Sequence, residues 1–179
     1  TMMYGLEAVT VPSNLEVGLK EWSPQNISIK TNPEAIIWAV DGVDDNSVAF
    51  AARLMEKGVE VRIIDKEALL SKQSLSRGSI AVLAMDNPEY EDLSETVNSI
   101  ASDLDISVLS IESGFGAEEL PDWGGRHFRL LERPQIAILS QSGFSSYDVG
   151  VSWWSLDHHL GIRHSQIDAS LVNYADLRR

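Results

Sequence analysis

The stretch that decides the fold runs from residue 35 to residue 64 and reads AIIWAVDGVDDNSVAFAARLMEKGVEVRII. It opens on residues 35–40, a continuous apolar run of strand length that is typical of a strand covered on both faces of its sheet. Asp and Asn at residues 44–46 are N-cap candidates for a helix that ends at Gly58. Residues 59–64 predict the next strand, so the stretch predicts a β-α-β unit with a right-handed crossover.

The helix inside this stretch shows an apolar stripe. Its positions recur at i, i+3, i+4 and i+7, and they are Val48, Ala51, Ala52 and Met55. This spacing is typical of a helix face that packs on a core, so we expect these four side chains to face the sheet.

A second unit of the same kind follows, with a strand predicted over residues 78–84, a helix over 92–104 and a strand over 106–111. The order β-α-β-β-α-β over residues 35–111 predicts an α/β module with two solutions. In a ferredoxin-like split sheet, the link over residues 65–77 is a hairpin arm. In an open parallel sheet, that link is a further crossover. The link is long for a tight hairpin, which favours the parallel sheet and leaves both solutions open.

The segments beside this module are less regular. Residues 1–34 carry short alternating runs between prolines, which predict an extended arm or edge strands. Residues 112–133 hold four glycines and a proline, and their length predicts a Gly-rich linker loop after the 35–111 module.

Residues 134–179 predict the start of another α/β module. A strand is expected over residues 136–139, a helix over 148–160 and a strand over 162–167. One face of that helix carries Val149, Trp153, Leu156 and Leu160, and Gly161 caps its end.

The end of this unit repeats the end of the first one. Residues 58–65 read GVEVRIID and residues 161–168 read GIRHSQID, at a constant offset of 103 residues. Such an echo indicates either an internal duplication or the helix-Gly-strand-Asp turn that any α/β fold uses, and we favour the turn.

Composition excludes several classes of protein. The chain has no Cys, so it carries no disulfide, no Cys-based zinc site and no cysteine nucleophile. It has 27 Asp and Glu against 14 Lys and Arg, a formal charge of −13, which disfavours nucleic acid and anionic membranes as partners. No stretch approaches the eighteen or so apolar residues of a membrane helix. No signal-peptide pattern opens the chain.

Metal and cofactor sites are not predicted. Eleven carboxylates and no Lys or Arg lie over residues 86–122, which indicates a solvated acidic face, because the alternating spacing and turn glycine of a calcium loop are missing. His158 and His159 are adjacent on a helix and point about 100° apart, so they do not form an i, i+4 chelating pair. We expect no metal and no cofactor.

A candidate ligand site lies in the loop over residues 141–148, at the strand-to-helix junction where open α/β sheets bind small molecules. Its polar or flexible members are Ser142, Gly143, Ser145, Ser146 and Asp148. The same residue types are ordinary turn and N-cap residues. The loop has neither a nucleotide-binding fingerprint nor a G-x-S-x-G elbow, and no catalytic residue is predicted.

Three tryptophans are further candidates. Trp123, in the Gly-rich loop, is predicted as a ligand-stacking ring, and Trp153 belongs to the core stripe of its helix. Trp154 lies on a different face of that helix together with His158, and we expect these two at an interface with another domain or a second copy.

A family resemblance rests on scattered positions. They are residues 131–139 (LERPQIAIL), residues 145–150 (SSYDVG), Trp153, Leu156-Asp157 and Gly161-Ile162, together with Arg77-Gly78-Ser79 before an earlier strand. This pattern resembles the region after the catalytic domain in large bacterial zinc carboxypeptidases of the carboxypeptidase A type. In those proteins that region holds a module similar to class I glutamine amidotransferases, and an Arg-Pro pair precedes its first strand.

The resemblance implies a role without catalysis. The family's zinc ligands, a His-x-x-Glu pair and a distant His, match nothing here, and the amidotransferase cysteine is missing. It implies a fragment of a larger bacterial protein that is periplasmic or secreted, with a flavodoxin-like, amidotransferase-like unit that continues past residue 179. We therefore expect an accessory or assembly domain whose partner is another domain of the same polypeptide or a second copy. The alternative is a small-ligand or hydrolytic site in the 141–148 loop.

Overall fold

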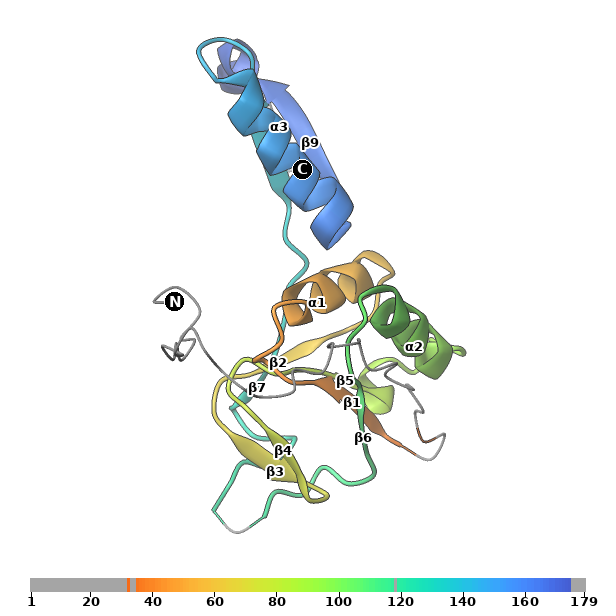
Figure 1. Ribbon diagram of the computed structural model, residues 1–179. Coiled ribbons are helices and arrows are strands. Elements are labelled where there is room, and N and C mark those ends of the chain that lie inside the picture. The colour runs from red at the N-terminus through yellow and green to blue at the C-terminus, as the bar shows by residue number, and fades with distance from the viewer. Residues whose placement is uncertain (1–31, 33–34, 118, 175–179) are drawn as a thin grey trace, which may run out of the picture.

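The computed structural model describes residues 32, 35–117 and 119–174. Its larger part, which we call the body (residues 35–133), is built on a five-stranded antiparallel sheet in the order β6-β1-β5-β2-β7 (Figure 1). The strands are β1 (Ile37–Val40), β2 (Arg62–Ile64), β5 (Ile80–Leu83), β6 (Leu109–Ile111) and β7 (Phe128–Leu130). Helices α1 (Ser47–Glu56) and α2 (Leu93–Asp103) lie together on one face of this sheet.

The sheet decides between the two predicted solutions. Strand β5 pairs with both β1 and β2 in antiparallel register, and β6 pairs antiparallel with β1. This is the ferredoxin-like split arrangement, so the preference for an open parallel sheet was wrong. The link over residues 65–77 contains no helix. It forms a separate hairpin of β3 (Ala68–Leu70) and β4 (Gln73–Leu75), after which the chain re-enters the five-stranded sheet as β5.

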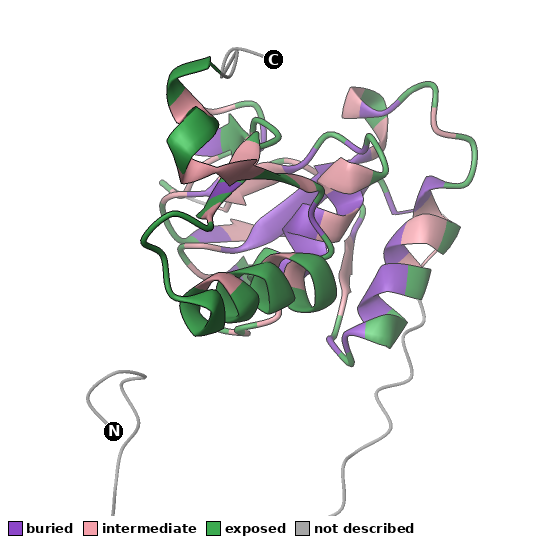
Figure 2. Cartoon of the chain, turned by 90° about the horizontal axis from the view of Figure 1, so that it is seen from above, coloured by how far each residue is buried: buried purple, intermediate pink, exposed green. Residues whose placement is uncertain are grey.

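The sheet is covered on both faces, as the apolar run at its centre predicts. All four residues of β1 are buried, and so are all four of β5. Because side chains alternate along a strand, Trp38 and Val40 pack towards α1 and α2, while Ile37 and Ala39 pack on the opposite side. Figure 2 shows these buried residues gathered at the centre of the body.

Helix α1 packs on the core through a face that matches most of the predicted stripe, since Ala51 and Ala52 are buried and Met55 packs against the core cluster, and Val48 is the exception. The large buried side chains are Phe50 and Leu54, whereas Val48 is 61% exposed. The two large side chains, one turn apart, decide which face packs on the sheet.

The second face of the sheet is covered by the β3–β4 hairpin and by part of the segment over residues 112–133. Leu70 and Leu75 of the hairpin form one core cluster with Trp123 and Phe128. The segment predicted as a linker loop therefore belongs to the body, because it adds edge strand β7 to the sheet next to β2.

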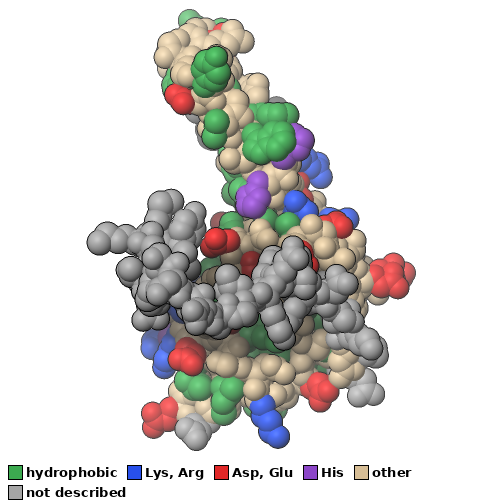
Figure 3. All heavy atoms as spheres, in the orientation of Figure 1, with side chains coloured by type: hydrophobic (Ala, Val, Ile, Leu, Met, Phe, Trp, Pro, Cys, Tyr) green, Lys and Arg blue, Asp and Glu red, His purple; other side chains and the backbone are tan. Residues whose placement is uncertain are grey.

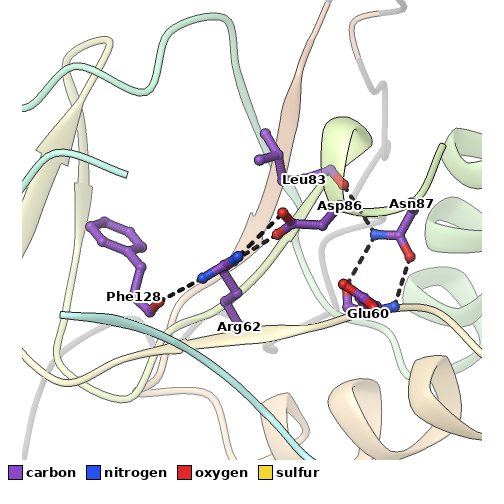
Figure 4. Close-up of polar contacts among 6 residues, drawn as sticks. All are labelled: Glu60, Arg62, Leu83, Asp86, Asn87 and Phe128. Carbon is purple, nitrogen blue, oxygen red and sulfur yellow. Dashed lines mark hydrogen bonds and ion pairs between the residues drawn. The ribbon is translucent and has the colours of Figure 1, made fainter. Parts of the chain in front are cut away.

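A group of polar contacts holds β2 to β7 and to the short helix η1 (Ala84–Asp86) (Figure 4). Arg62 Nε donates to Asp86 Oδ2 at 2.6 Å, and Arg62 Nη1 donates to the carbonyl oxygen of Phe128 at 2.9 Å. The hydrogen bond with Asp86 raises the pKa of Arg62 further above its usual value. Asn87 Nδ2 donates to the carbonyl oxygens of Glu60 and Leu83 at 3.1 and 3.0 Å.

The smaller part, which we call the arm (residues 134–174), projects from the body beyond α1 (Figure 1). It contains β8 (Ile136–Ser140), α3 (Ser146–Trp154), a π-helical segment η2 (Ser155–Leu160), β9 (His164–Asp168) and the short helix η3 (Ala169–Tyr174). Strands β8 and β9 pair in parallel and form a two-stranded sheet. The predicted β-α-β order is confirmed, and Gly161 ends η2 in the left-handed conformation.

The arm is attached to the body through α1. Glu56, the last residue of α1, accepts from Arg133 Nη2 at 3.0 Å and from Arg163 Nε at 3.0 Å. Arg53 Nη2 donates to the carbonyl oxygens of His158 and His159 at 3.5 and 3.2 Å. The described contacts between the two parts thus include a group of polar interactions at the end of α1.

Candidate functional site

The loop between β8 and α3 brings two segments of the arm together at the carboxyl end of its sheet. Ser142 Oγ donates to Asp168 Oδ1 at 3.1 Å, across the ends of two parallel strands. Asp168 also accepts from the backbone N–H and the hydroxyl of Ser170, at 2.9 and 2.8 Å. These bonds, with the Ser170 N–H first, hold the pKa of Asp168 below its ordinary value.

The backbone of this loop is unusual. Gln141 and Ser142 have φ angles of +59° and +24°, and Gly143 follows at +96°. Positive φ is uncommon for residues with a side chain, and such conformations concentrate at functional sites. The strain turns the chain sharply between β8 and α3, and it places Ser142 beside Asp168.

The other predicted members of this loop serve the helix. Ser145 is the N-cap of α3, and its side-chain oxygen accepts from the backbone N–H of Asp148 at 3.5 Å. Asp148 lies in the first turn, where a carboxylate complements the helix dipole. Ser146 and Gly143 are exposed. The structure thus pairs Ser142 with Asp168 and does not gather the remaining loop residues around a common point.

Trp123 lies away from this loop, in the core of the body. Its side chain is 8% exposed, its ring centroid is 5.0 Å from that of Phe128, and the Arg62 guanidinium carbon lies 5.9 Å from the ring centroid. A ring packed in this way offers no open surface for a ligand, so its predicted stacking role finds no support in this position.

Helix α3 has apolar residues on two opposite faces. The inner face holds the predicted stripe, of which Val149, Leu156 and Leu160 are half-buried and Trp153 is 36% exposed. The outer face holds Tyr147, Val151 and Trp154, which are 85%, 68% and 58% exposed. At about 100° per residue the two stripes lie nearly 180° apart on the helix. Hydrophobic side chains show along the arm in Figure 3.

His158 extends this outer face into η2. The imidazole of His158 stacks on the ring of Trp154 with centroids 4.0 Å apart, and it meets Trp153 edge-on at 5.3 Å. The predicted pairing of Trp154 with His158 on one face is therefore confirmed, and we call the set Tyr147, Val151, Trp154 and His158 the outer seam.

The two-stranded sheet of the arm also leaves apolar residues open. Along β8 the side chains alternate, and Ile138 is buried while its neighbour Leu139 is 37% exposed and Ala137 is exposed. Among the described residues, α3 contacts β8, and Ala137 and Leu139 on the other face of this strand remain exposed.

Sequence reasoning missed two groups of residues. Asp65 Oδ1 lies 2.7 Å from His127 Nδ1 and its Oδ2 lies 3.3 Å from Arg129 Nε, so these residues join the end of β2 to β7. The hydrogen bond with His127 is the main reason that the pKa of Asp65 is lowered. The second group is Glu56 with its two arginines. The sequence pointed to Asp65 only through the similarity of residues 58–65 and 161–168, which puts Asp65 and Asp168 at equivalent positions.

The described part of the chain shows neither a grouped set of metal ligands nor a membrane-spanning helix. No three His, Asp or Glu side chains among residues 32, 35–117 and 119–174 are grouped so as to hold a metal ion. In the same part of the chain, no helix is long and apolar enough to cross a bilayer. Comparison of the chain with protein-family models, with curated proteins and with solved structures found no match.

Proposed function

We propose that this chain is a non-catalytic accessory module that docks a second folded unit on its arm. The observation that carries the proposal is the outer seam of α3, which exposes two large aromatic rings and a valine on a helix whose opposite face already packs on the sheet. A helix that is apolar on both sides is typical of a position between two layers.

The energetics favour coverage of this surface. Burying a large apolar side chain is worth about 1.5–3 kcal/mol, and Trp and Tyr are the residues that most often dominate binding at interfaces. The open face of the β8–β9 sheet adds to the argument, because parallel strands are found almost only in sheets covered on both faces. The partner we infer is a folded domain of the same polypeptide or a second copy of the chain.

The family resemblance supports the same proposal. Zinc carboxypeptidases of this type carry the similar region after their catalytic domain, so a module of this kind would work next to an active site that another domain supplies. In this proposal the chain contributes a docking surface and no catalytic residue.

A photo-crosslinking residue placed at Val151 tests the proposal in cells of the source organism. We expect ultraviolet light to give a discrete, saturable adduct, because a docked unit would lie within reach of this position. The matched control places the same group at Val48, which is also an exposed valine on a helix but lies on the body. Equal adducts at the two positions, or none at Val151, would overturn the docking role.

A second candidate function is a small-ligand or hydrolytic site in the loop over residues 141–148. It is favoured by the bond between Ser142 and Asp168 at the carboxyl end of two parallel strands, which is the edge where open α/β sheets bind ligands. A panel of sugars and amino acids screened by thermal shift tests it. A ligand that stabilises the wild-type chain and fails to stabilise Ser142→Ala and Asp168→Asn would support the site, whereas equal shifts in all three proteins would exclude it.

A further inference from the structure

We propose that the edge of the body formed by β2 and β7 binds a phosphate dianion, held by Arg77, Arg126 and Arg129. This site lies on the body and is independent of the docking function proposed for the arm. Two features carry it: the chain brings the three arginines to one carboxylate and one imidazole, and an excess of positive charge remains there.

Backbone pairing places the first residues of the site at the β2–β7 edge of the sheet (Figure 1). Asp65 follows β2, and its N–H donates to the carbonyl oxygen of His127 at 3.0 Å, which extends the ladder by one pair. Because side chains alternate along a strand, His127 and Arg129 project from the same face of the sheet as Asp65. Asp65 Oδ1 lies 2.7 Å from His127 Nδ1, and Oδ2 lies 3.3 Å from Arg129 Nε. Each carboxylate oxygen therefore faces one basic group.

Arg126 adds a second guanidinium on the other side of the imidazole. Its Nε donates to His127 Nε2 at 3.4 Å, so it meets a ring nitrogen and not a carboxylate. With Nε2 as the acceptor, the ring proton is on Nδ1 and faces Asp65. The imidazole is then neutral, and the Arg126 contact does not cancel the charge of the guanidinium.

Arg77 brings a third guanidinium from the segment before β5. The N–H of the next residue, Gly78, donates to the carbonyl oxygen of Ile64 at 2.7 Å, and this bond fixes the backbone beside Arg77 to the end of β2. The pKa of Asp65, which is lowered chiefly by the hydrogen bond with His127, is lowered further by the positive charge of Arg77. Arg77 therefore acts on the same carboxylate as the basic groups of β7.

The charge of this group is opposite to that of the chain. Residues 35–133 carry 19 Asp and Glu against nine Lys and Arg, and the whole chain has a formal charge of −13. Three of those nine basic residues lie here with one carboxylate, which gives the group a formal charge of +2. A phosphate monoester carries a charge close to −2 at neutral pH, so one such group balances the excess.

The chemistry of the side chains favours phosphate as well. A guanidinium offers five N–H donors in a planar fork that matches the oxygens of a phosphate group. Arg129 directs Nε at Asp65 while its side chain is 65% exposed, so the rest of its fork is accessible to an incoming anion. Because the site is open to solvent, which screens the charges, we expect a dissociation constant on the order of 1 mM for inorganic phosphate.

Nuclear magnetic resonance of the ¹⁵N-labelled 179-residue chain tests the site. Inorganic phosphate is titrated at about pH 7.5 and constant ionic strength. We expect saturable shifts of the ring nitrogens of His127 and of the arginine Nε–H signals. Sodium chloride at the same ionic strength should give no saturable shift. Phosphate shifts that do not saturate, or that chloride reproduces, would overturn the site.

Replacing single arginines tests which side chains hold the anion. Arg77→Gln and Arg129→Gln each remove one of the three positive charges, and we expect each to weaken phosphate binding about fivefold to tenfold. The matched control Arg163→Gln removes an arginine of the arm that is 78% exposed and also pairs with a carboxylate. Arg77 lies outside the strands, and the amide shifts of β2 and β7 check that Arg77→Gln keeps their pairing. Unchanged binding in both variants, or an equal loss in Arg163→Gln, would exclude the site.

Other anions identify the source of the phosphate. Phenyl phosphate that binds at least as tightly as inorganic phosphate assigns the site to a phosphate ester, whereas a preference for inorganic phosphate assigns it to the free ion. Acetate carries a single negative charge and should bind at least about tenfold more weakly than phosphate. Equal binding of acetate would overturn the assignment to a dianion. None of these results depends on the crosslinks from position 151, so the site and the docking function stand or fall separately.

Discussion

The body and the arm are built from the same kind of unit and reach opposite outcomes. Each contains a strand, a helix, a glycine and a second strand with an aspartate at or just after its end, and residues 58–65 and 161–168 carry the two similar endings. In the body two helices and a hairpin enclose a sheet whose central strands are buried on both faces. In the arm one helix covers one face, and α3 has no fully buried residue. The difference teaches that local sequence specifies the helices and strands, whereas burying both faces of a sheet requires a second layer of structure packed on it.

The largest expected effect is a difference in the loss of stability when a leucine of the body and a leucine of the arm are each replaced by alanine. Leu54 on α1 is fully buried in the body, and Leu156 in η2 is half-buried in the arm. We expect Leu54→Ala to lower the free energy of unfolding by about 3 kcal/mol, because it leaves a cavity in a packed core, and Leu156→Ala to lower it by less than about 1 kcal/mol. Urea unfolding followed by far-ultraviolet circular dichroism measures both. Equal losses would mean that the arm is as well enclosed as the body.

An intermediate effect is expected where the two parts join. Glu56→Gln removes the carboxylate that Arg133 and Arg163 share, so we expect the arm to move more freely with a loss of only about 0.5–1 kcal/mol in stability. Because the chain has no cysteine, spin labels can be attached at Met85→Cys and Leu171→Cys alone, both exposed positions.

The distance between these labels reports the movement. We expect double electron–electron resonance to give a broader distance distribution for Glu56→Gln than for the parent protein. The control Glu95→Gln, an exposed carboxylate on α2, should leave the distribution unchanged. A distribution that stays narrow in Glu56→Gln would show that apolar packing, and not the shared carboxylate, fixes the arm.

The sequence predicts the elements of this chain better than their arrangement. The helices α1, α2 and α3 and the strands β1 and β8 follow from apolar spacing and caps. The direction of β5 does not follow from the sequence, because it depends on whether residues 65–77 form a hairpin or a crossover. A segment of this length can form either connection. Strand β7 is three residues long and follows a glycine-rich loop, so its pattern is too short to distinguish from the loop.

The candidate sites divide in the same way. The pairing of Trp154 and His158 follows from their i, i+4 spacing, which is a local property. The contact of Ser142 with Asp168 joins positions 26 residues apart, and the contacts of Glu56 join positions up to 107 residues apart. Such contacts depend on how strands align and how two parts dock, and no spacing along the chain encodes them.

The smallest expected effect is a change in the pH dependence of stability on replacing Asp65 or Asp168, the two aspartates at equivalent positions of the similar segments 58–65 and 161–168. The pKa of Asp65 is lowered chiefly by its hydrogen bond with His127, and that of Asp168 chiefly by the Ser170 N–H. A lowered pKa stabilises the folded state at pH values above the unfolded pKa of about 3.9, and that stability is lost as the pH falls through the folded pKa. Asp65→Asn should therefore be less stable than the parent protein at pH 7, and the difference should narrow below about pH 4.

The part of the chain that responds should differ between the two aspartates. Amide hydrogen exchange, measured at pH 7 and at pH 4, should report weaker protection at pH 7 in β2 and β7 for Asp65→Asn and in the arm alone for Asp168→Asn, because each carboxylate joins segments of one part only. The exposed carboxylate of Asp45 serves as a control through Asp45→Asn. If Asp168→Asn also weakens protection in the body, the two parts unfold as one cooperative unit, and the contrast between an enclosed body and an open arm does not extend to their stability.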